Sequence, residues 1–450
     1  MTMADAPLHA VATGAAAPAW TCPFCPLLCD GFGVDRSTLP WRLVGSDCPR
    51  ALQGLARFGQ AATVAQPSID GRPATLDAAI AAAARILERS RQALFGGLGT
   101  DVAGARALYR LACATGAIGD AAGGAALMHA LRALQDRGQF TTTLAEVRTR
   151  ADVIVCLGAS PTSRYPEFFR RVGIGEAHVA QRHIAFVGAA VDAALSVAVR
   201  TSSESIALEG DVYATTALLG ALVAGRAVPN PPPALAALAE RLRAARYAVV
   251  VLDSAALPAH GALIYEQVER LVASLNIDTR AALLPLAGAD GASTVNQVFA
   301  WLSGLPLRSR AGPLGLEHEP VVFDAGRLIA DGAVDALLWV ASYGTEPAPP
   351  ANDLPRIVLG HPATASPTSA SASVFIPVST PGIGAAGHLF RTDGVVLMPL
   401  AALAPDGLPT VAAVVTRIEA ALRAGRRAAR QPARVATGDR PMYSSGEGAS

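Results

Sequence analysis

The sequence predicts an α/β protein built on parallel sheets of the Rossmann-like kind. Short stretches such as 151–158 and 247–253 are apolar throughout, and helical patterns of about 10–15 residues separate such stretches along the chain. Strands without polar alternation are typical of parallel sheets that are covered on both faces. At 450 residues the chain is long enough for two or three domains, each with its own core.

The expected helices follow apolar residues spaced three and four apart. They are 76–91, 102–115, 165–171, 211–224, 235–245, 261–275 and 410–424, with a further helix start at Pro49. The expected strands are 93–99, 151–158, 183–188, 247–253, 281–285, 336–341 and 355–359. The stretch 373–398 is rich in glycine and proline and is expected to consist of turns.

Changes in composition divide the chain into segments. Residues 1–19 and 425–450 are expected to be disordered tails. Between the tails we expect a cysteine-rich segment, a first α/β lobe and a second α/β lobe, at 20–64, 74–227 and 234–424. A linker around 65–73 and a proline-rich seam at 228–233 separate these three parts.

A cysteine motif lies near the start of the chain. Cys22, Cys25, Cys29 and Cys48 follow the spacing C-x2-C-x3-C-x18-C and are four of the six cysteines. Thiolates this close in sequence can converge on one soft metal ion or cluster. The favoured interpretation is a [4Fe–4S] cluster held by the four cysteines. Structural zinc and a site without metal are the alternatives.

Several residues outside the motif were also considered as candidates. Asp30 and Asp47 stand beside cysteines of the motif, where their negative charge would lower the potential of a cluster. Cys113 and Cys156 lie in apolar helix and strand patterns, so both are expected to be buried core residues. The glycines of 96–99 lack the full dinucleotide-binding fingerprint and are interpreted as a tight turn.

Composition excludes several function classes. The net charge of +1 provides no basic field for nucleic acid or acidic lipid. All 37 basic residues are arginine, which excludes Schiff-base chemistry, a Walker-A nucleotide site and a lysine general base. Only 16% of the residues are charged, which suggests that partners cover part of the surface.

The sequence also indicates a compartment. No apolar run reaches the roughly 20 residues of a membrane span, and the start lacks the basic region of a secretory signal. We therefore expect a cytoplasmic protein that does not enter a membrane. In the cytoplasm, clustered cysteines favour a metal site over disulfides.

Taken together, the motifs resemble the molybdopterin oxidoreductase superfamily, and within it the B subunits of formylmethanofuran dehydrogenases. Besides the four cysteines, the matching stretches are 151–162, 294–306, 374–377 and 382–394. The resemblance implies that the cysteines hold a [4Fe–4S] cluster and that pterin dinucleotides lie between the α/β domains. It also implies that the α/β lobes are interleaved along the chain.

One segment departs from this pattern. In the family, the segment that matches 119–132 supplies a cysteine or selenocysteine ligand to tungsten or molybdenum, commonly as Cys-His. Here it reads GDAAGGAALMHALR, with Met128 and His129 as the nearest counterpart. A neutral thioether is a poor substitute for an anionic thiolate. We therefore expect a tungsten or molybdenum pterin to be absent.

This chain has the four cysteines but no cysteine at the position of the redox ligand. In this combination it resembles the B subunits of bacterial formyltransferase/hydrolase complexes. The resemblance implies a non-redox structural subunit that carries no catalytic residues. Its expected partners are the other members of such a complex, an amidohydrolase-like A subunit together with the C and D subunits, in tetrahydromethanopterin-linked conversion of formaldehyde to formate. Two alternatives stay open: an active tungsten or molybdenum pterin formylmethanofuran or formate dehydrogenase, and a zinc-stabilised α/β binding protein.

Overall fold

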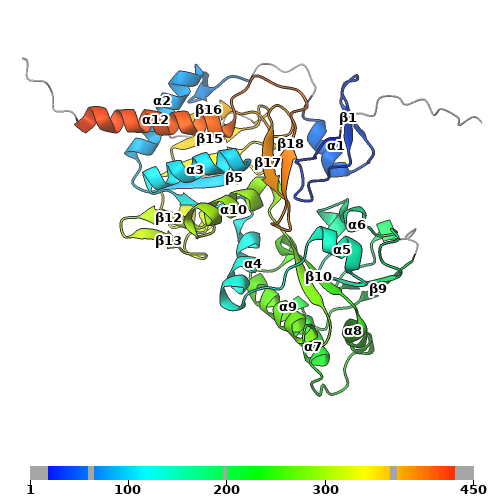
Figure 1. Ribbon diagram of the computed structural model, residues 1–450. Helices are drawn as coiled ribbons and strands as arrows, with labels where there is room; N and C mark the ends of the chain where they lie inside the picture. The colour runs from blue at the N-terminus through cyan, green and yellow to red at the C-terminus, as the bar shows by residue number, and fades with distance from the viewer. Residues whose placement is uncertain (1–18, 59–64, 196–199, 365–371, 431–450) are drawn as a thin grey trace, which may run out of the picture.

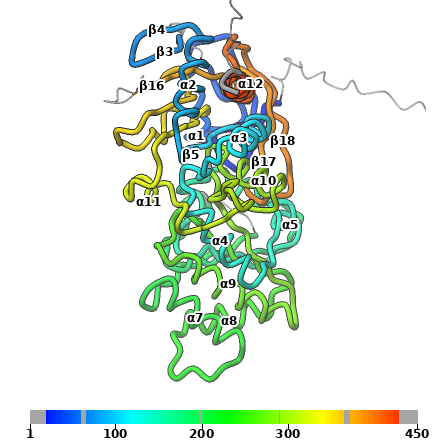
Figure 2. The backbone as a smooth tube through the Cα atoms, turned by 90° about the vertical axis from the view of Figure 1, so that its left-hand side faces the viewer, coloured from blue at the N-terminus to red at the C-terminus, as the bar shows by residue number. Residues whose placement is uncertain are grey.

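The computed structural model describes residues 19–58, 65–195, 200–364 and 372–430, which form an α/β fold with two main sheets (Figure 1). The smaller sheet is parallel throughout. In the larger sheet the five central strands are parallel and the outer strands are antiparallel. The predicted α/β class with parallel sheets is therefore confirmed. Figures 1 and 2 show one lobe above the other, with helix α4 (Gly124–Arg137) between them.

The small lobe is built on a five-stranded sheet in the order β11-β10-β7-β8-β9. Its strands are β7 (Val153–Leu157), β8 (Arg182–Val187), β9 (Thr201–Ile206), β10 (Ala248–Asp253) and β11 (Ala281–Leu286). Its helices are α5 (Leu144–Arg150), α6 (Phe168–Arg171), α7 (Val212–Val223), α8 (Pro233–Ala244) and α9 (Gly261–Leu275), with short 3-10 turns at Pro161–Ser163, Ala193–Leu195 and Ser254–Ala256.

Alternate side chains of the small sheet enter two different cores. Val155 and Val250 face one core, which they share with helices α7, α8 and α9. Ile154 and Phe186 face the other core, which they share with the cysteine-rich segment. Because successive residues of a strand point to opposite faces, these strands are buried on both sides, as their unbroken apolar sequences predict.

The large lobe contains a nine-stranded sheet in the order β13-β12-β6-β5-β14-β15-β16-β3-β4. Its strands are β3 (Ser68–Ile69), β4 (Arg72–Pro73), β5 (Ala93–Gly99), β6 (Ile118–Gly119), β12 (Ser309–Gly312), β13 (Gly315–His318), β14 (Ala336–Ala341), β15 (Arg356–Gly360) and β16 (Ser373–Pro377). Its helices are α2 (Leu76–Arg89), α3 (Val102–Thr115), α10 (Ala292–Ser303), α11 (Ala325–Ala330) and α12 (Val411–Arg430), with a 3-10 turn at Ala289–Gly291.

The two sheets do not follow the order of the chain. Each expected lobe, 74–227 and 234–424, contributes strands to both sheets. The small sheet takes all its strands from 153–286, so this stretch separates β6 from β12 within the large lobe. Helix α4 links the two lobes, because its Met128 packs into the core of the large lobe and its Ala133 into that of the small lobe.

Two smaller units lie beside the sheets. The cysteine-rich segment contains the hairpin β1 (Gly33–Asp35) and β2 (Arg42–Val44), followed by helix α1 (Pro49–Leu55). A second hairpin is formed by β17 (Gly387–Phe390) and β18 (Leu397–Leu400). Leu28 of the cysteine-rich segment shares a small core with Leu389 and Met398 of this hairpin.

Amphipathic helices were the most predictable elements. Helices α3 and α9 have the predicted bounds, and α2 ends two residues early, at Arg89 rather than 91. Side-chain caps fix two of the starts, because Thr75 accepts from the amide of Ala78 and Asp101 from that of Gly104. Strands β5 and β14 also lie where the sequence places them.

Two expectations near the C-terminus are wrong. The stretch 373–398 contains strands β16 and β17 and the start of β18 rather than turns alone, because pairing with β15 and within a hairpin overrides its glycines and prolines. The expected tail at 425–450 begins too early, since α12 continues through Arg430. Arg426 there donates to the carbonyl of Ala114 on α3, at 3.0 Å. Residues 1–18 and 431–450 lie outside the described part.

In the described residues, no helix is both long and apolar enough to cross a membrane.

Two glycines of strand β5 lie where a side chain would collide with the neighbouring strand β14. A Cβ on Gly96 would lie 2.8 Å from the ring of Trp339, and one on Gly97 would lie 2.6 Å from the carbonyl oxygen of Val340. Gly97 also has a φ of +71°. These glycines therefore permit close packing of β5 on β14.

A buried carboxyl group yields the first prediction. Glu269 on α9 accepts from the amide of Phe140 at 3.1 Å, while its Oε1 has no partner. Burial raises the pKa of Glu269 from 4.5 to about 7, opposed by that hydrogen bond. The folded state therefore holds this proton more tightly than the unfolded state, so the stabilisation declines as the pH rises from about 4.5 through 7.

We expect Glu269→Gln to remove this decline while keeping the hydrogen-bond acceptor. Between pH 5 and 8 the wild-type chain should lose about 2–3 kcal/mol of unfolding free energy relative to the variant. Urea unfolding of both chains at the two pH values measures this difference. An identical pH dependence in the two chains would contradict the prediction.

Candidate functional site

The cysteine motif folds into a tight loop closed by backbone hydrogen bonds. The amide of Cys22 donates to the carbonyl of Cys29 at 2.9 Å, and the amide of Leu28 donates to that of Cys25 at 3.0 Å. Leu28 takes the left-handed conformation, with φ at +46°, which turns the chain back on itself. Cys48 stands immediately before α1, and its amide donates to Ser46 Oγ at 3.0 Å.

The loop and the start of α1 bring all four cysteines to one place. Cys22, Cys25, Cys29 and Cys48 line a single cavity of about 10 Å³. All four are free thiols and are buried. The β1–β2 hairpin occupies the stretch between Cys29 and Cys48 and turns the chain back, so that Cys48 can lie beside the other three cysteines.

Burial dominates the electrostatics of these thiols. It raises the pKa of Cys22 well above its usual value and raises the pKa values of Cys25 and Cys29 to about 12. Nearby arginines act in the opposite direction: Arg50 lowers the pKa of Cys25, and Arg171 lowers that of Cys29. Without a metal, these three thiols are therefore protonated at neutral pH, and any metal would have to displace their protons.

The donor chemistry suits a soft metal, but the arrangement does not form a ligand set. In the described ranges, no group of three or more His, Cys, Asp or Glu side chains is placed to hold a metal ion. A cavity of about 10 Å³ has room for about one water molecule, whereas a [4Fe–4S] cluster has eight atoms.

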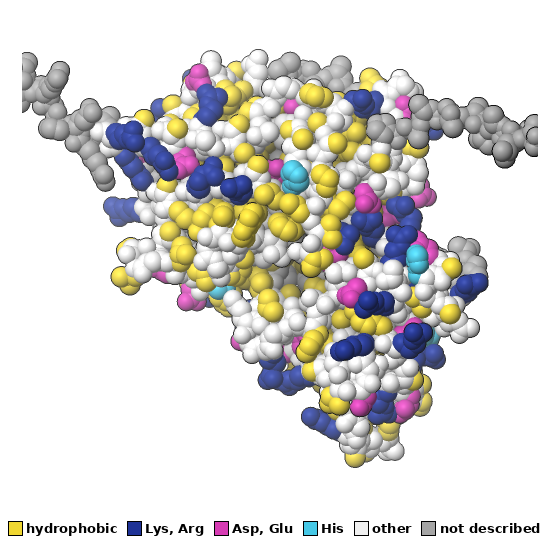
Figure 3. Space-filling view, viewed as in Figure 1, with side chains coloured by type: hydrophobic (Ala, Val, Ile, Leu, Met, Phe, Trp, Pro, Cys, Tyr) yellow, Lys and Arg dark blue, Asp and Glu magenta, His cyan; other side chains and the backbone are white. Residues whose placement is uncertain are grey.

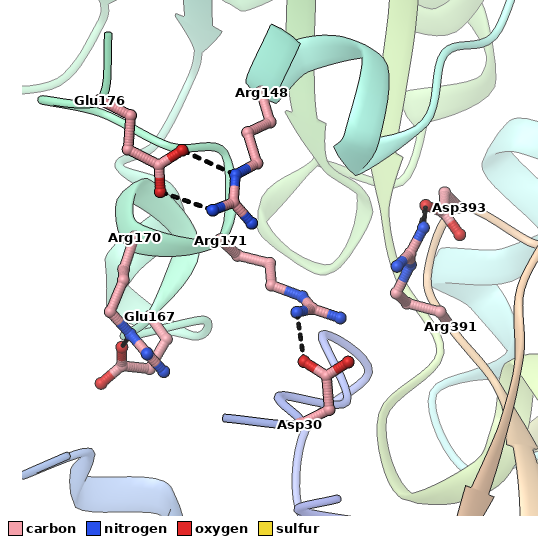
Figure 4. A network of polar contacts seen from close by, with 8 residues as sticks. All are labelled: Asp30, Arg148, Glu167, Arg170, Arg171, Glu176, Arg391 and Asp393. Carbon is pink, nitrogen blue, oxygen red and sulfur yellow. Dashed lines mark hydrogen bonds and ion pairs between the residues drawn. The ribbon is translucent and has the colours of Figure 1, made fainter. Parts of the chain in front are cut away.

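Charged contacts bind the cysteine-rich segment to the small lobe (Figure 4). Arg171 of α6 pairs with Asp30 at 2.6 Å, and Glu167 accepts from Ser46 Oγ at 2.6 Å. On the other side, the amide of Thr392 donates to the carbonyl of Pro26 at 2.8 Å. The negative charge expected from Asp30 beside the motif is thus compensated by an arginine.

The segment 119–132 contains no thiolate and packs as a structural element. Met128 is 3% exposed and belongs to the core of the large lobe. His129 is also buried, and burial lowers its pKa, as do Arg132 and Arg308. The residue at the expected ligand position therefore meets apolar neighbours.

A buried ion pair occupies the start of the same segment. Arg308 Nε lies 3.2 Å from Asp120, and Arg308 Nη2 lies 2.6 Å from Asp324. Burial raises the pKa of Asp120 to about 6, against the lowering effect of Arg308. Removing one partner would leave a buried charge uncompensated, so this pair fixes the geometry around β6 and β12.

The remaining predictions for single residues had mixed outcomes. Cys156 is fully buried in β7, as predicted. The prediction for Cys113 is wrong, because its position on α3 is exposed. Arg308 and the pair Arg391–Asp393 were not found from the sequence. The partners of Arg308 include the distant Asp120, and Arg391 and Asp393 lie in a loop without a regular pattern. No residue spacing therefore indicates these ion pairs.

Comparisons with known proteins agree with one another. No protein-family model matches the chain. Over 366 residues, 78% of this chain and 96% of the relative, it is 33% identical to the Fhc B subunit of the formyltransferase/hydrolase complex of Methylorubrum extorquens. It is 25% identical over 407 residues to the B subunit of tungsten-containing formylmethanofuran dehydrogenase 2 of Methanocaldococcus jannaschii, covering 83% of this chain and 91% of that protein.

A solved structure supports the same relationship. The fold matches a chain of the formyltransferase/hydrolase complex FhcABCD from Methylorubrum extorquens, determined in complex with methylofuran. The TM-score is 0.70 at 32% identity, over 80% of this chain and 99% of that chain. Since sequence and fold agree over almost the whole length of the relatives, the chain belongs to the family of formyltransferase/hydrolase complex B subunits.

Proposed function

We propose that this chain is a non-redox structural subunit of a formyltransferase/hydrolase complex in tetrahydromethanopterin-linked one-carbon metabolism. Its partners would be the amidohydrolase-like A subunit together with the C and D subunits, and the complex would act in the cytoplasm. The single observation that carries the proposal is the segment 119–132, which contains no cysteine and in which Met128, the nearest counterpart of the ligand that the resemblance implies, is buried in the large-lobe core. The fold would be that of the molybdopterin oxidoreductases, retained without their redox centre.

The role of such a chain is to hold its partners in place. The two sheets, α4 and the cysteine-rich segment share cores, so the chain can present a rigid surface. Hydrolysis and formyl transfer would take place on other subunits. The identity of 33% to the Fhc relative, compared with 25% to the tungsten enzyme, favours this interpretation over an active dehydrogenase.

The function is tested on the chain co-expressed with its partner subunits. We expect a stable complex that releases formate from formyl-tetrahydromethanopterin and contains no stoichiometric tungsten or molybdenum. The complex should not reduce a viologen dye with formylmethanofuran or formate. Bound pterin with stoichiometric tungsten or molybdenum, or dye reduction, would establish the dehydrogenase alternative instead.

Substitutions at Met128 separate a packing role from a ligand role. We expect Met128→Ala to destabilise the chain by about 2–5 kcal/mol, because it opens a cavity in the large-lobe core. Met128→Leu nearly preserves the side-chain volume and should cost less than about 1.5 kcal/mol. Urea unfolding measures both values. If Met128→Leu abolished activity of the complex without loss of stability, Met128 would have a chemical role.

We also propose that the four cysteines take up a soft metal that stabilises the segment without taking part in turnover. A [4Fe–4S] cluster is favoured, with zinc as the alternative, because four thiols converge on one cavity. The protons on these buried thiols oppose it, so metal binding would have to displace them. The proposed complex does not depend on the outcome.

Metal analysis of one anaerobically purified sample tests this site. We expect about four iron atoms per chain, or about one zinc ion, to be lost in Cys25→Ser. Cys113→Ser serves as the matched control, because Cys113 is exposed and lies on α3, outside the motif. Wild-type chain free of both metals, with unchanged stability, would show that the cysteines serve only as packing residues.

A further inference from the structure

An open pocket of about 310 Å³ lies in the large lobe between helix α2 and the edge of the sheet that contains β16 and β3. Ala82, Arg85, Ile86 and Arg89 line one side, and their spacing of three and four residues places them on one face of α2. The β3–β4 hairpin and the starts of β15 and β16 form the other side. Figure 2 shows α2 beside these strands.

The pocket lies at the amino ends of the parallel strands. Asp335 immediately precedes β14, Pro355 immediately precedes β15, and Ser373 begins β16. Ligands of open parallel sheets usually bind outside the carboxyl ends of the strands. The pocket is therefore at the opposite edge of the sheet, and none of the described residues that line it belongs to the cysteine motif or to the segment 119–132.

Two arginines of the lining are unpaired. Arg85 and Arg89 are exposed, and neither forms a hydrogen bond or an ion pair with the part of the chain that the structure describes. Figure 3 shows basic side chains gathered over α12 and α3 of the same lobe, and some of these are paired, such as Arg423 with Glu419. Like charges one helical turn apart destabilise a helix, so the unpaired arginines do not serve the stability of α2.

The two carboxylates of the lining are used by the fold. Asp70, in the turn between β3 and β4, accepts from the amide of Ser373 at 2.8 Å, and its own amide donates to the carbonyl of Ser373 at 2.8 Å. Asp335 accepts from the amides of Arg91 at 2.8 Å and Gln92 at 3.2 Å. The guanidinium groups are therefore the charged groups of the lining that stay free to bind a ligand.

We propose that this pocket binds a small organic anion, either a phosphate ester or a carboxylate. Its acidic group would accept hydrogen bonds from Arg85 and Arg89, because the guanidinium fork matches the oxygens of both kinds of anion. Its apolar body would lie against Ile69 and Ile86. The pocket volume is at the lower end of the roughly 300–1,000 Å³ of typical ligand pockets. The proposed function does not require this site, so the two stand or fall separately.

The test measures binding of phenyl phosphate and of benzoate to the full chain by isothermal titration calorimetry. We expect one site per chain, and we expect Arg85→Gln/Arg89→Gln to weaken binding by about tenfold or more, because charge-assisted hydrogen bonds are lost. The matched control is Arg106→Gln/Arg110→Gln, which removes the same charge at the same spacing from α3, outside the pocket. The control should bind like wild type.

Three further ligand comparisons complete the test. The anion that binds more tightly identifies the acidic group that the site prefers. Inorganic phosphate, which lacks the apolar body, and benzyl alcohol, which lacks the charge, should each bind about tenfold more weakly or less. No saturable binding of either aromatic anion up to about 10 mM would overturn the proposal. Equal weakening in both double variants, or equally tight binding of benzyl alcohol, would also overturn it.

Thermal unfolding checks that weaker binding is not caused by unfolding. Replacing both arginines by glutamine relieves the repulsion between like charges on α2, so Arg85→Gln/Arg89→Gln should be at least as stable as wild type. Binding is therefore compared between folded chains.

Discussion

The burial of the cysteine-rich segment against both lobes is the contact on which the arrangement of this chain depends. Trp20 and Phe32 are 1% and 2% exposed and share a core with one face of the small sheet. Trp20 Nε1 also donates to the carbonyl of Gly382 at 2.9 Å, which is part of the loop before β17. Full burial of such rings contributes about 1.5–3 kcal/mol each, so the segment closes an apolar face that would otherwise meet water.

Helix α4 provides the second connection between the two lobes. Met128 of this helix faces the large-lobe core and Ala133 the small-lobe core. The ion pair between Asp120 and Arg308 fixes the chain just before this helix. Because both ends of this segment take part in packing, the segment helps to hold the two lobes together.

The sequence predicted the elements whose signals are local. Helix α9 and strand β14 follow from periodicity and unbroken apolarity, which depend only on neighbouring residues. Helix α4 was missed, because it begins after Gly123 without a side-chain cap and faces two cores, which blurs its apolar stripe. The convergence of the cysteines could be predicted from spacing. The ion pair of Arg308 could not, because its partner lies 188 residues away in the chain.

The presence of the four motif cysteines is by itself a weak indication of redox catalysis. A buried neutral thiol behaves as a small apolar side chain, so four of them beside Trp20 and Phe32 are compatible with the core whether or not a metal is bound. A thiolate ligand in the segment 119–132 has no such second use, since an ionised group there would be buried among apolar neighbours. The proposed function, which needs no redox centre, would therefore remove the constraint on that ligand first. The cysteines can persist as packing residues, and the two lobes keep their connection.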